Sequence, residues 1–329
     1  MAKTPEAVKA LLDDLVSRAN RHKGKELAEL LELKKTTMES KGLPFDGELY
    51  TWDMPYLTRL MSHDRAIDLS DIAEYFPLQP TVNAMLNLFG NLLGFVFTQV
   101  TESDRSRLST TGRGDDLLWH EDVLMYTVWN TDDVHDGSFV GYLYLDLHPR
   151  EGKYSHAQCH AVQLGFYRPP NPDGTPGKVH YPSTSLLANF TSPTADKPSL
   201  LRYGEVTMLF HELGHGIHDL SGRSRYARFF GASTVGDFNE APSQMLENWC
   251  RIPEGPRLFS EHYKTGEKLP EDMITALLAA RHDQAATNLL VQMRMCLFDL
   301  MVHWGAEVDV QEVYERYEYM VGAKGDGSA

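Results

Sequence analysis

The spacing of hydrophobic residues divides the chain into a helical stretch, a strand-rich stretch and a second helical stretch. Residues 5–39 combine good helix formers with apolar side chains at Val8, Leu11, Leu12 and Val16, three or four positions apart, so this pattern predicts a helix. Further helical patterns are found at 71–75, from Thr81 onward, and at 204–220, 241–250, 270–300 and 308–321.

Two stretches in the first half of the chain need a separate interpretation. The longest apolar run, Leu86–Val100, is broken by polar residues and glycines, so it is too short and interrupted for a membrane span and predicts a buried helix. Ser103–Asp116 is polar and contains Gly112 and Gly114, which is typical of a loop.

The middle of the chain has the alternation of a β-sheet. Val123–Trp129 and Phe139–Leu147 are rich in β-branched and aromatic residues, and the acidic, glycine-containing run 132–137 between them predicts a hairpin turn. Val162–Tyr167 and Ser183–Phe190 are further candidate strands. These patterns predict a helix-dominated α+β fold with a small, mostly antiparallel sheet.

The same patterns divide the chain into three regions. We expect a helical region at 1–118, a small β-sheet region at 119–200 and a second helical region at 201–329. The chain of 329 residues is long enough to bury a large core without disulfides.

Composition indicates which partners and which cellular compartment to expect. Aspartate and glutamate number 46 against 31 lysines and arginines, a net charge of −15, which repels phosphate backbones and anionic lipids. Three cysteines without CxxC spacing argue against a disulfide framework or a thiolate zinc site. The first residues lack the apolar core of a signal peptide. We therefore expect a soluble intracellular protein with no nucleic-acid or membrane partner.

The chemistry is concentrated in the run His211-Glu212-Leu213-Gly214-His215. On a helix, His211 and His215 lie on one face, one turn apart, and both imidazoles can bind one Zn²⁺ ion. Glu212, one position round the helix, can instead contact a water on that ion as a general base. The competing interpretation is an exposed polar helix face with a chance motif.

A catalytic zinc site needs a third protein ligand. A metzincin would have Gly at 218 and His at 221, where this chain has His218 and Ser221, so that class is excluded. The stretch 237–247 supplies carboxylates instead, with Glu240 and Glu247 within about 20° of each other around a helix. We favour Glu240 as ligand and Glu247 as the partner that orients a bound imidazole. A solvated surface position is the alternative for Glu247.

Four neighbours extend this hypothesis. Asp219 could orient a ligand imidazole and His218 could line the cleft, although for each a purely structural role is equally open. Gly214 and Gly216 each cost helix stability, which suggests that another backbone packs closely there, with chance drift in sequence as the alternative.

The sequence resembles the thimet oligopeptidase family of zinc metallopeptidases, the M3 peptidases, which include neurolysin and saccharolysin. The likeness extends over nearly the whole chain to about residue 305. Besides the HExxH run, the blocks that carry it are Glu240–Trp249, Tyr144–Tyr154, Trp119–Val123, Leu43–Gly47 and Ala188–Thr191.

The resemblance implies a zincin-like catalytic core, with Zn²⁺ bound by His211, His215 and Glu240, and Glu212 as the base. It also implies that Ala188, Asn189 and Phe190 end a strand at the sheet edge along which substrate lies. Gly231 matches a family glycine that closes over the substrate. The substrates would be short peptides, and the compartment the cytoplasm or the mitochondrial intermembrane space.

The resemblance also predicts what this chain lacks. Relative to the family we expect the three regions to form one truncated catalytic-domain fragment, without the N-terminal channel wall and without a C-terminal segment of His and paired Tyr residues. The expected function is therefore a zinc metalloendopeptidase, and the alternative is a catalytically inactive zinc- or peptide-binding fragment. A third interpretation, an acidic helical interaction protein, requires Glu240 to lie far from His211.

Overall fold

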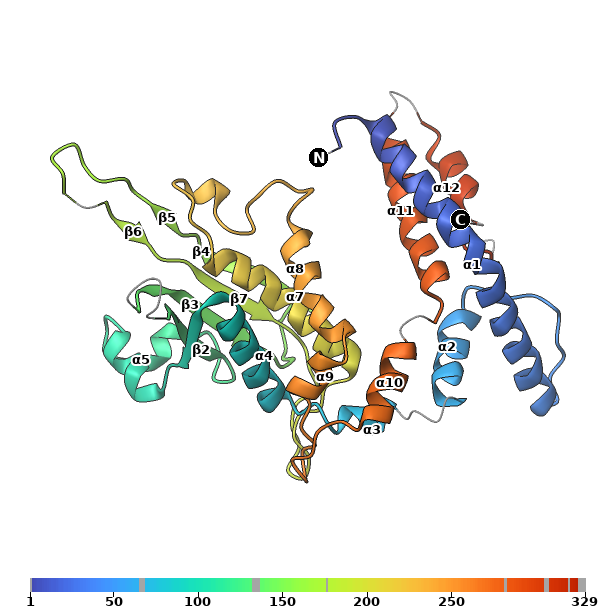
Figure 1. The fold of residues 1–329 in the computed structure, drawn as a ribbon, viewed down its shortest axis with the longest axis horizontal. Helices are drawn as coiled ribbons and strands as arrows, with labels where there is room; N and C mark the ends of the chain where they lie inside the picture. Colours follow the sequence, from blue (N-terminus) through green and yellow to red (C-terminus); the bar gives the residue numbers. More distant parts are fainter. Residues whose placement is uncertain are drawn as a thin grey trace. The chain divides into compact units, whose positions relative to one another are not determined.

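The computed structural model describes residues 2–64, 69–131, 137–175, 177–280, 283–304, 308–318 and 320–324. The chain forms two compact units, one made of Met1–Asp68 with Thr275–Ala329 and the other of Leu69–Ile274. The second unit contains the candidate zinc motif (Figure 1).

The first unit is helical. Its helices are α1 (Pro5–Ser40), α2 (Asp53–Asp64), α11 (Ala285–Trp304) and α12 (Val310–Glu318). Its core includes Leu12 of α1 packed with Met293 and Leu297 of α11. The Glu26 carboxylate of α1 accepts the backbone N–H of Ala286 at 3.0 Å and caps the start of α11.

Helix α11 also tests the expectation of no membrane partner. By length and composition it could cross a bilayer, and 28% of its most apolar window is buried. A single such helix is weak evidence for a span, because the core helix of a soluble protein has the same length and composition. The absence of a membrane partner stays a prediction.

The second unit is built on a five-stranded mixed sheet with strand order β1-β2-β3-β7-β4. The strands are β1 (Phe95–Gln99), β2 (Leu124–Asn130), β3 (Phe139–Asp146), β7 (Ser183–Leu187) and β4 (Gln158–Gln163). Neighbouring strands are antiparallel except β3 and β7, which run parallel. A two-stranded ribbon is formed by β5 (Phe166–Tyr167) and β6 (Val179–His180).

The second unit also contains helices. They are α3 (Leu69–Ala73), α4 (Leu78–Leu93), α5 (Glu102–Leu108), α7 (Tyr203–Leu220), α8 (Glu240–Leu246), α9 (Glu254–Phe259) and α10 (Glu271–Ala280), which crosses the boundary of the units in sequence. Three 3₁₀ turns are η1 (Gly114–Leu117), η2 (Ala227–Phe229) and η3 (Glu247–Arg251).

Helix α7 lies against β3, β7 and β4 and also contacts α8, as Figure 1 shows. It starts at Tyr203, where the Glu205 carboxylate accepts the Arg202 backbone N–H at 2.7 Å. Leu209, Phe210 and Leu213 are fully buried on its inner face. Helix α7 is therefore held rigidly on the sheet, which makes it a firm base for the HExxH run.

A buried ionic cluster fixes the ends of β3 and β7. Asp146 is fully buried, and both of its carboxylate oxygens accept hydrogen bonds from the Arg150 guanidinium at 2.7 Å. The Lys153 ammonium lies 2.8 Å from the same carboxylate and donates to the Ala188 carbonyl. The indole of Trp119 donates to Asp146 at 2.8 Å. Hydrogen bonds from Arg150, Lys153 and Trp119 outweigh the effect of burial and lower the pKa of Asp146 to about 2.

The α+β class with a small sheet is confirmed, and the β2–β3 hairpin forms as expected, although residues 132–136 of its turn lie outside the described part. The expectation of one helix over Leu86–Val100 is wrong. Gly94 adopts a left-handed conformation at φ +72°, which ends α4 and lets the chain continue as β1.

A further difference concerns the first third of the chain. The expected loop at Ser103–Asp116 contains α5, because Thr101 caps the N–H of Asp104. Pro55 lies in the first turn of α2, where proline is tolerated. The division at 1–118, 119–200 and 201–329 follows secondary structure and stays a prediction.

Candidate metal centre

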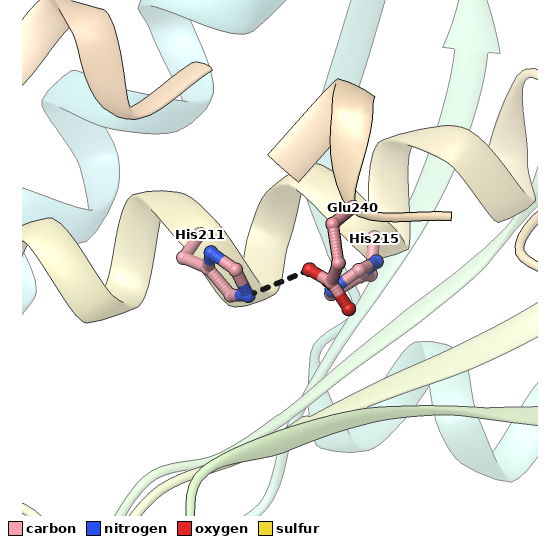
Figure 2. A group of neighbouring side chains, drawn as sticks. All are labelled: His211, His215 and Glu240. Carbon is pink, nitrogen blue, oxygen red and sulfur yellow. Dashed lines mark ion pairs between the residues drawn. The ribbon is translucent and has the colours of Figure 1, made fainter. Parts of the chain in front are cut away.

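Three side chains converge beside α7. His211 and His215 lie one turn apart on this helix, and Glu240 comes from the start of α8. The Nε2 atom of His211 lies 3.3 Å from Oε2 of Glu240, and Nε2 of His215 lies 3.2 Å from the same oxygen. Figure 2 shows the two imidazoles on α7 and Glu240 reaching across from the start of α8. The donor atoms of this His211–His215–Glu240 group all lie within 4.8 Å of one another.

These separations fit a tetrahedral zinc ion. With ligand distances of about 2.0–2.1 Å, two ligands of a tetrahedral zinc lie about 3.3 Å apart. Both imidazole-to-carboxylate distances are close to this value. The donor set, two imidazoles and one carboxylate, is also one that catalytic zinc uses. The third interpretation, which needed Glu240 far from His211, is therefore wrong.

A close approach of α7 and α8 places Glu240. A Cβ atom added to Gly214 would lie 2.6 Å from the Cα of Ser243, so only glycine fits at this crossing. The Ser243 hydroxyl, which is fully buried, donates to Oε2 of Glu240 at 2.9 Å. The expected backbone contact is thus confirmed at Gly214, and Ser243 orients the carboxylate. At Gly216 the expectation is wrong, because an added Cβ would meet only side-chain atoms at 3.5 Å or more.

The Glu247 carboxylate fixes the orientation of His211. Nδ1 of His211 donates to Oε1 of Glu247 at 2.7 Å, and Oε2 of Glu247 accepts from Arg251 at 2.5 Å. With the proton on Nδ1, the lone pair of Nε2 is free to bind a metal ion. The structure therefore brings Glu247 to the place proposed for it. Nδ1 of His215 is buried and has no hydrogen-bond partner among the described residues.

The side chain of Glu212 extends from α7 to the strand β4. Burial raises the pKa of its carboxyl, while His211, His215 and a hydrogen bond from the Cys159 backbone act in the opposite direction. A carboxylate of raised pKa in a half-buried position is suited to accept a proton.

Asp219 has other surroundings than expected, whereas the cleft-lining role of His218 stays a prediction. The Asp219 carboxylate accepts hydrogen bonds from Thr184 and from the Ala232 backbone and contacts neither ligand imidazole. This corrects the expectation that Asp219 orients one of them. Burial lowers the pKa of His218, whose ring lies edge-on to Phe238.

The expected sheet edge at Ala188–Phe190 is also corrected. These residues follow β7, which lies between β3 and β4 in the sheet, so β4 is the outer strand. The backbone N–H groups of Ala188 and Phe190 donate to the carbonyls of Asp146 and Leu147 at 2.9 Å each. Asn189 donates to the Tyr154 carbonyl. A substrate role for Ala188, Asn189 and Phe190 stays a prediction.

Gly231 occupies a position that glycine alone fits. Its φ is +53°, and an added Cβ would lie 2.5 Å from the Cα of Asp219. Its proposed role in closing over substrate stays a prediction beside this structural one.

Sequence reasoning missed two residues of the site, Ser243 and Arg251. Ser243 lies three positions after Glu240 and Arg251 four positions after Glu247, and a helix brings side chains at these spacings together.

The HExxH helix and the carboxylate of the following helix define a metallopeptidase type of site. Comparison with known proteins agrees: the model of peptidase family M3 matches residues 1–323, and the chain belongs to this family. It is 39% identical to saccharolysin of Saccharomyces cerevisiae over 92% of this chain and 41% of that protein.

Two other relatives match a similar share of this chain at somewhat lower identity. A thimet-like oligopeptidase of Dictyostelium discoideum is 32% identical over 96% of this chain and 45% of that protein. Oligopeptidase A of Escherichia coli is 34% identical over 92% of this chain and 41% of that protein. The chain thus spans less than half the length of these relatives.

Proposed function

We propose that this chain carries the zinc centre of a metalloendopeptidase that hydrolyses short peptides. The observation that supports this most strongly is the convergence of His211, His215 and Glu240 at distances that suit one tetrahedral ion. Membership of family M3 and the names of its relatives as oligopeptidases support the same class of reaction and substrate.

Two of the three ligands are held by a neighbour among the described residues, His211 by Glu247 and Glu240 by Ser243. His211 and His215 would bind the ion through Nε2, and Glu240 through the carboxylate that Ser243 orients. Zinc in such a set lowers the pKa of water to about 7 and polarises the carbonyl oxygen of a peptide bond. The Glu247 hydrogen bond keeps His211 in the tautomer that such binding needs.

Glu212 would act as the proton acceptor. Burial raises the pKa of its carboxyl, which makes the carboxylate a stronger base and lets the acid form donate the same proton to the leaving amine. Because Glu212 follows His211 on α7, the helix holds it close to the ligand atoms of His211 and His215. Proton transfer and metal binding thus use adjacent residues of one helix.

The strand β4 is the best place for a peptide backbone. It is the outer strand of the sheet, packs on α7 and has mostly exposed side chains from His160 to Gln163. An extended peptide can add to such an edge through main-chain hydrogen bonds, largely independent of its sequence. The Cys159 backbone reaches Glu212, so a peptide on β4 would pass close to the base.

The compartment is proposed to be the cytoplasm, with the mitochondrial intermembrane space as the alternative. One relative, a mitochondrial intermediate peptidase of Arabidopsis thaliana, is compatible with the mitochondrial alternative.

Zinc analysis and peptide cleavage test this function together. We expect one zinc per chain, cleavage of a quenched short peptide that a chelator abolishes, and loss of at least about 100-fold in kcat in Glu212→Gln with zinc retained. Unchanged cleavage in Glu212→Gln would refute its role as the base. One zinc per chain with no cleavage at high protein concentration would favour the inactive zinc- or peptide-binding module.

A further inference from the structure

A set of short contacts joins the last turn of the metal helix to two strands and a loop. Asp219 of α7 is only 3% exposed, and its Oδ2 accepts a hydrogen bond from the Thr184 hydroxyl of β7 at 3.0 Å. Its Oδ1 accepts the backbone N–H of Ala232 at 2.9 Å. The Thr184 oxygen in turn lies 3.2 Å from the His160 carbonyl and 3.3 Å from the sulfur of Cys159, both on β4.

Burial of the Asp219 carboxylate costs desolvation free energy, which its hydrogen bonds must offset. A carboxylate loses hydration when it is buried, and within the described residues Asp219 forms no ion pair with a lysine or arginine at 4.0 Å or less. Its two hydrogen bonds come from different elements, β7 and the loop between α7 and α8. Thr184 is fully buried as well, so the contact is shielded from water.

The backbone ladder alone does not fix β4 firmly. The pairing of β4 with β7 shifts register between Ala161 and Gln163. Strand register determines which side chains face the helix, and a slip of one residue reverses them. The single proton of the Thr184 hydroxyl is shared between the Asp219 carboxylate and the His160 carbonyl, and its oxygen can accept the Cys159 thiol proton. These contacts lie just before this irregularity and connect β4 to Asp219.

We propose that Asp219 and Thr184 are positioning residues that hold the edge strand β4 in a fixed place over the metal helix. A peptide lying on β4 then meets the metal centre and Glu212 in one geometry, and the same carboxylate holds the loop at Ala232. This inference rests on the proposed peptidase function. Among the described residues no hydrogen bond or ion pair joins either residue to His211 or His215, so we expect their neutral variants to retain zinc.

The test uses isosteric substitutions in the zinc-loaded protein. Thr184→Val keeps the branched shape but removes the hydroxyl, whereas Thr184→Ser keeps the hydroxyl. Thr127→Val is the matched control, because the Thr127 hydroxyl lies on β2 of the same sheet and donates only to the Thr98 carbonyl at 3.3 Å. The readouts are amide hydrogen exchange by segment, the cobalt(II) absorption spectrum, and kcat and KM for a quenched peptide.

In Thr184→Val we expect exchange to rise by roughly tenfold in 158–163 and 230–233 and to stay unchanged in 124–130. The cobalt spectrum should not change, and kcat/KM should fall by roughly tenfold through both constants, because the peptide is displaced from the metal centre. Thr184→Ser should restore both readouts, and Thr127→Val should match the wild type.

The proposal is overturned if exchange in 158–163 stays within about twofold of the wild type, or if it rises equally in 124–130, which would show general loosening. It is also overturned if the strand loosens while kcat and KM stay constant. A wild-type chain that cleaves no peptide refutes the proposed function instead, and the exchange measurement then still decides whether Asp219 and Thr184 hold β4.

Discussion

Gly214 in the metal helix lies against Ser243 in the following helix so closely that a side chain on Gly214 would come within 2.6 Å of the Ser243 Cα. Ser243 in turn donates to the Glu240 carboxylate. The separation of the two helices therefore sets where the third ligand lies relative to His211 and His215. The glycine of the motif is a geometric requirement of the metal site.

Gly214→Ala should weaken zinc binding. Carbon atoms pack at about 3.5–4.0 Å, so α8 must move by about 1 Å and carry Glu240 out of ligand distance. We expect zinc affinity to fall at least about tenfold in a competition titration. Gly204→Ala is the control, since Gly204 lies on the same helix with no atom within 4 Å of its Cβ position. Equal affinity in both variants would contradict this role.

Glu247→Ala should also weaken zinc binding, by a different route. It removes the acceptor that holds Nδ1 of His211, so the ring can rotate and change tautomer. We expect zinc affinity to fall by about 10–100-fold, and Glu247→Gln, which keeps an acceptor oxygen, to lose less. Glu254→Ala on the exposed side of α9 is the control. If Glu247→Ala bound zinc as tightly as this control, Glu247 would be a surface residue only.

Gly231→Ala should destabilise the fold. Its φ of +53° is unfavourable for alanine, and the added Cβ would clash with Asp219. We expect a loss of about 1–3 kcal/mol in the free energy of unfolding, measured with urea. Gly236→Ala, in the same loop with open space around it, should change stability by less than about 0.5 kcal/mol. A stable Gly231→Ala variant with poor cleavage would instead support a direct role on substrate.

Asp146 should make stability depend on pH. Its pKa is lowered from 3.8 to about 2, so the folded state binds the proton less readily than the unfolded state. The stability this provides, about 2 kcal/mol, is present above pH 3.8 and is lost as pH falls toward 2.

Asp146→Asn leaves Lys153 buried without its anion, which should cost about 3–5 kcal/mol at pH 7. The difference from the wild type should shrink by about 1 kcal/mol at pH 3, because the unfolded chain, with a pKa of 3.8, then takes up the proton while the folded carboxylate is still mostly charged. Urea unfolding at both pH values measures it, with the exposed Asp13→Asn as control. A difference that is the same at both pH values would contradict the ionic role of Asp146.

Sequence reasoning went furthest where a local pattern implies a three-dimensional relation. The i, i+4 spacing of His211 and His215, and the carboxylate at Glu240, predicted the group that the structure brings together. Gly214 likewise predicted a close backbone, and the alternation of Val123–Trp129 and Phe139–Leu147 predicted the β2–β3 hairpin.

It failed where the outcome depends on tertiary contacts. Gly94 ends α4 in a left-handed conformation, although the apolar run continues past it, because β1 gains its hydrogen bonds from β2. The sequence of β7 is typical of any buried strand. Only its pairing with β4, on the side away from β3, shows that β7 is an internal strand of the sheet. Asp219 lies one turn from His215, but its direction is set by Thr184 and Ala232, which sequence spacing cannot indicate.

X-ray absorption at the zinc edge, recorded on protein loaded with one zinc per chain, tests the metal centre most directly. We predict two imidazole nitrogens at about 2.0–2.1 Å and carboxylate or water oxygens completing four-coordination, with one imidazole lost in His215→Ala. Sulfur ligation, a single imidazole in the wild type, or a spectrum unchanged in His215→Ala would contradict the proposal that His211, His215 and Glu240 hold the ion.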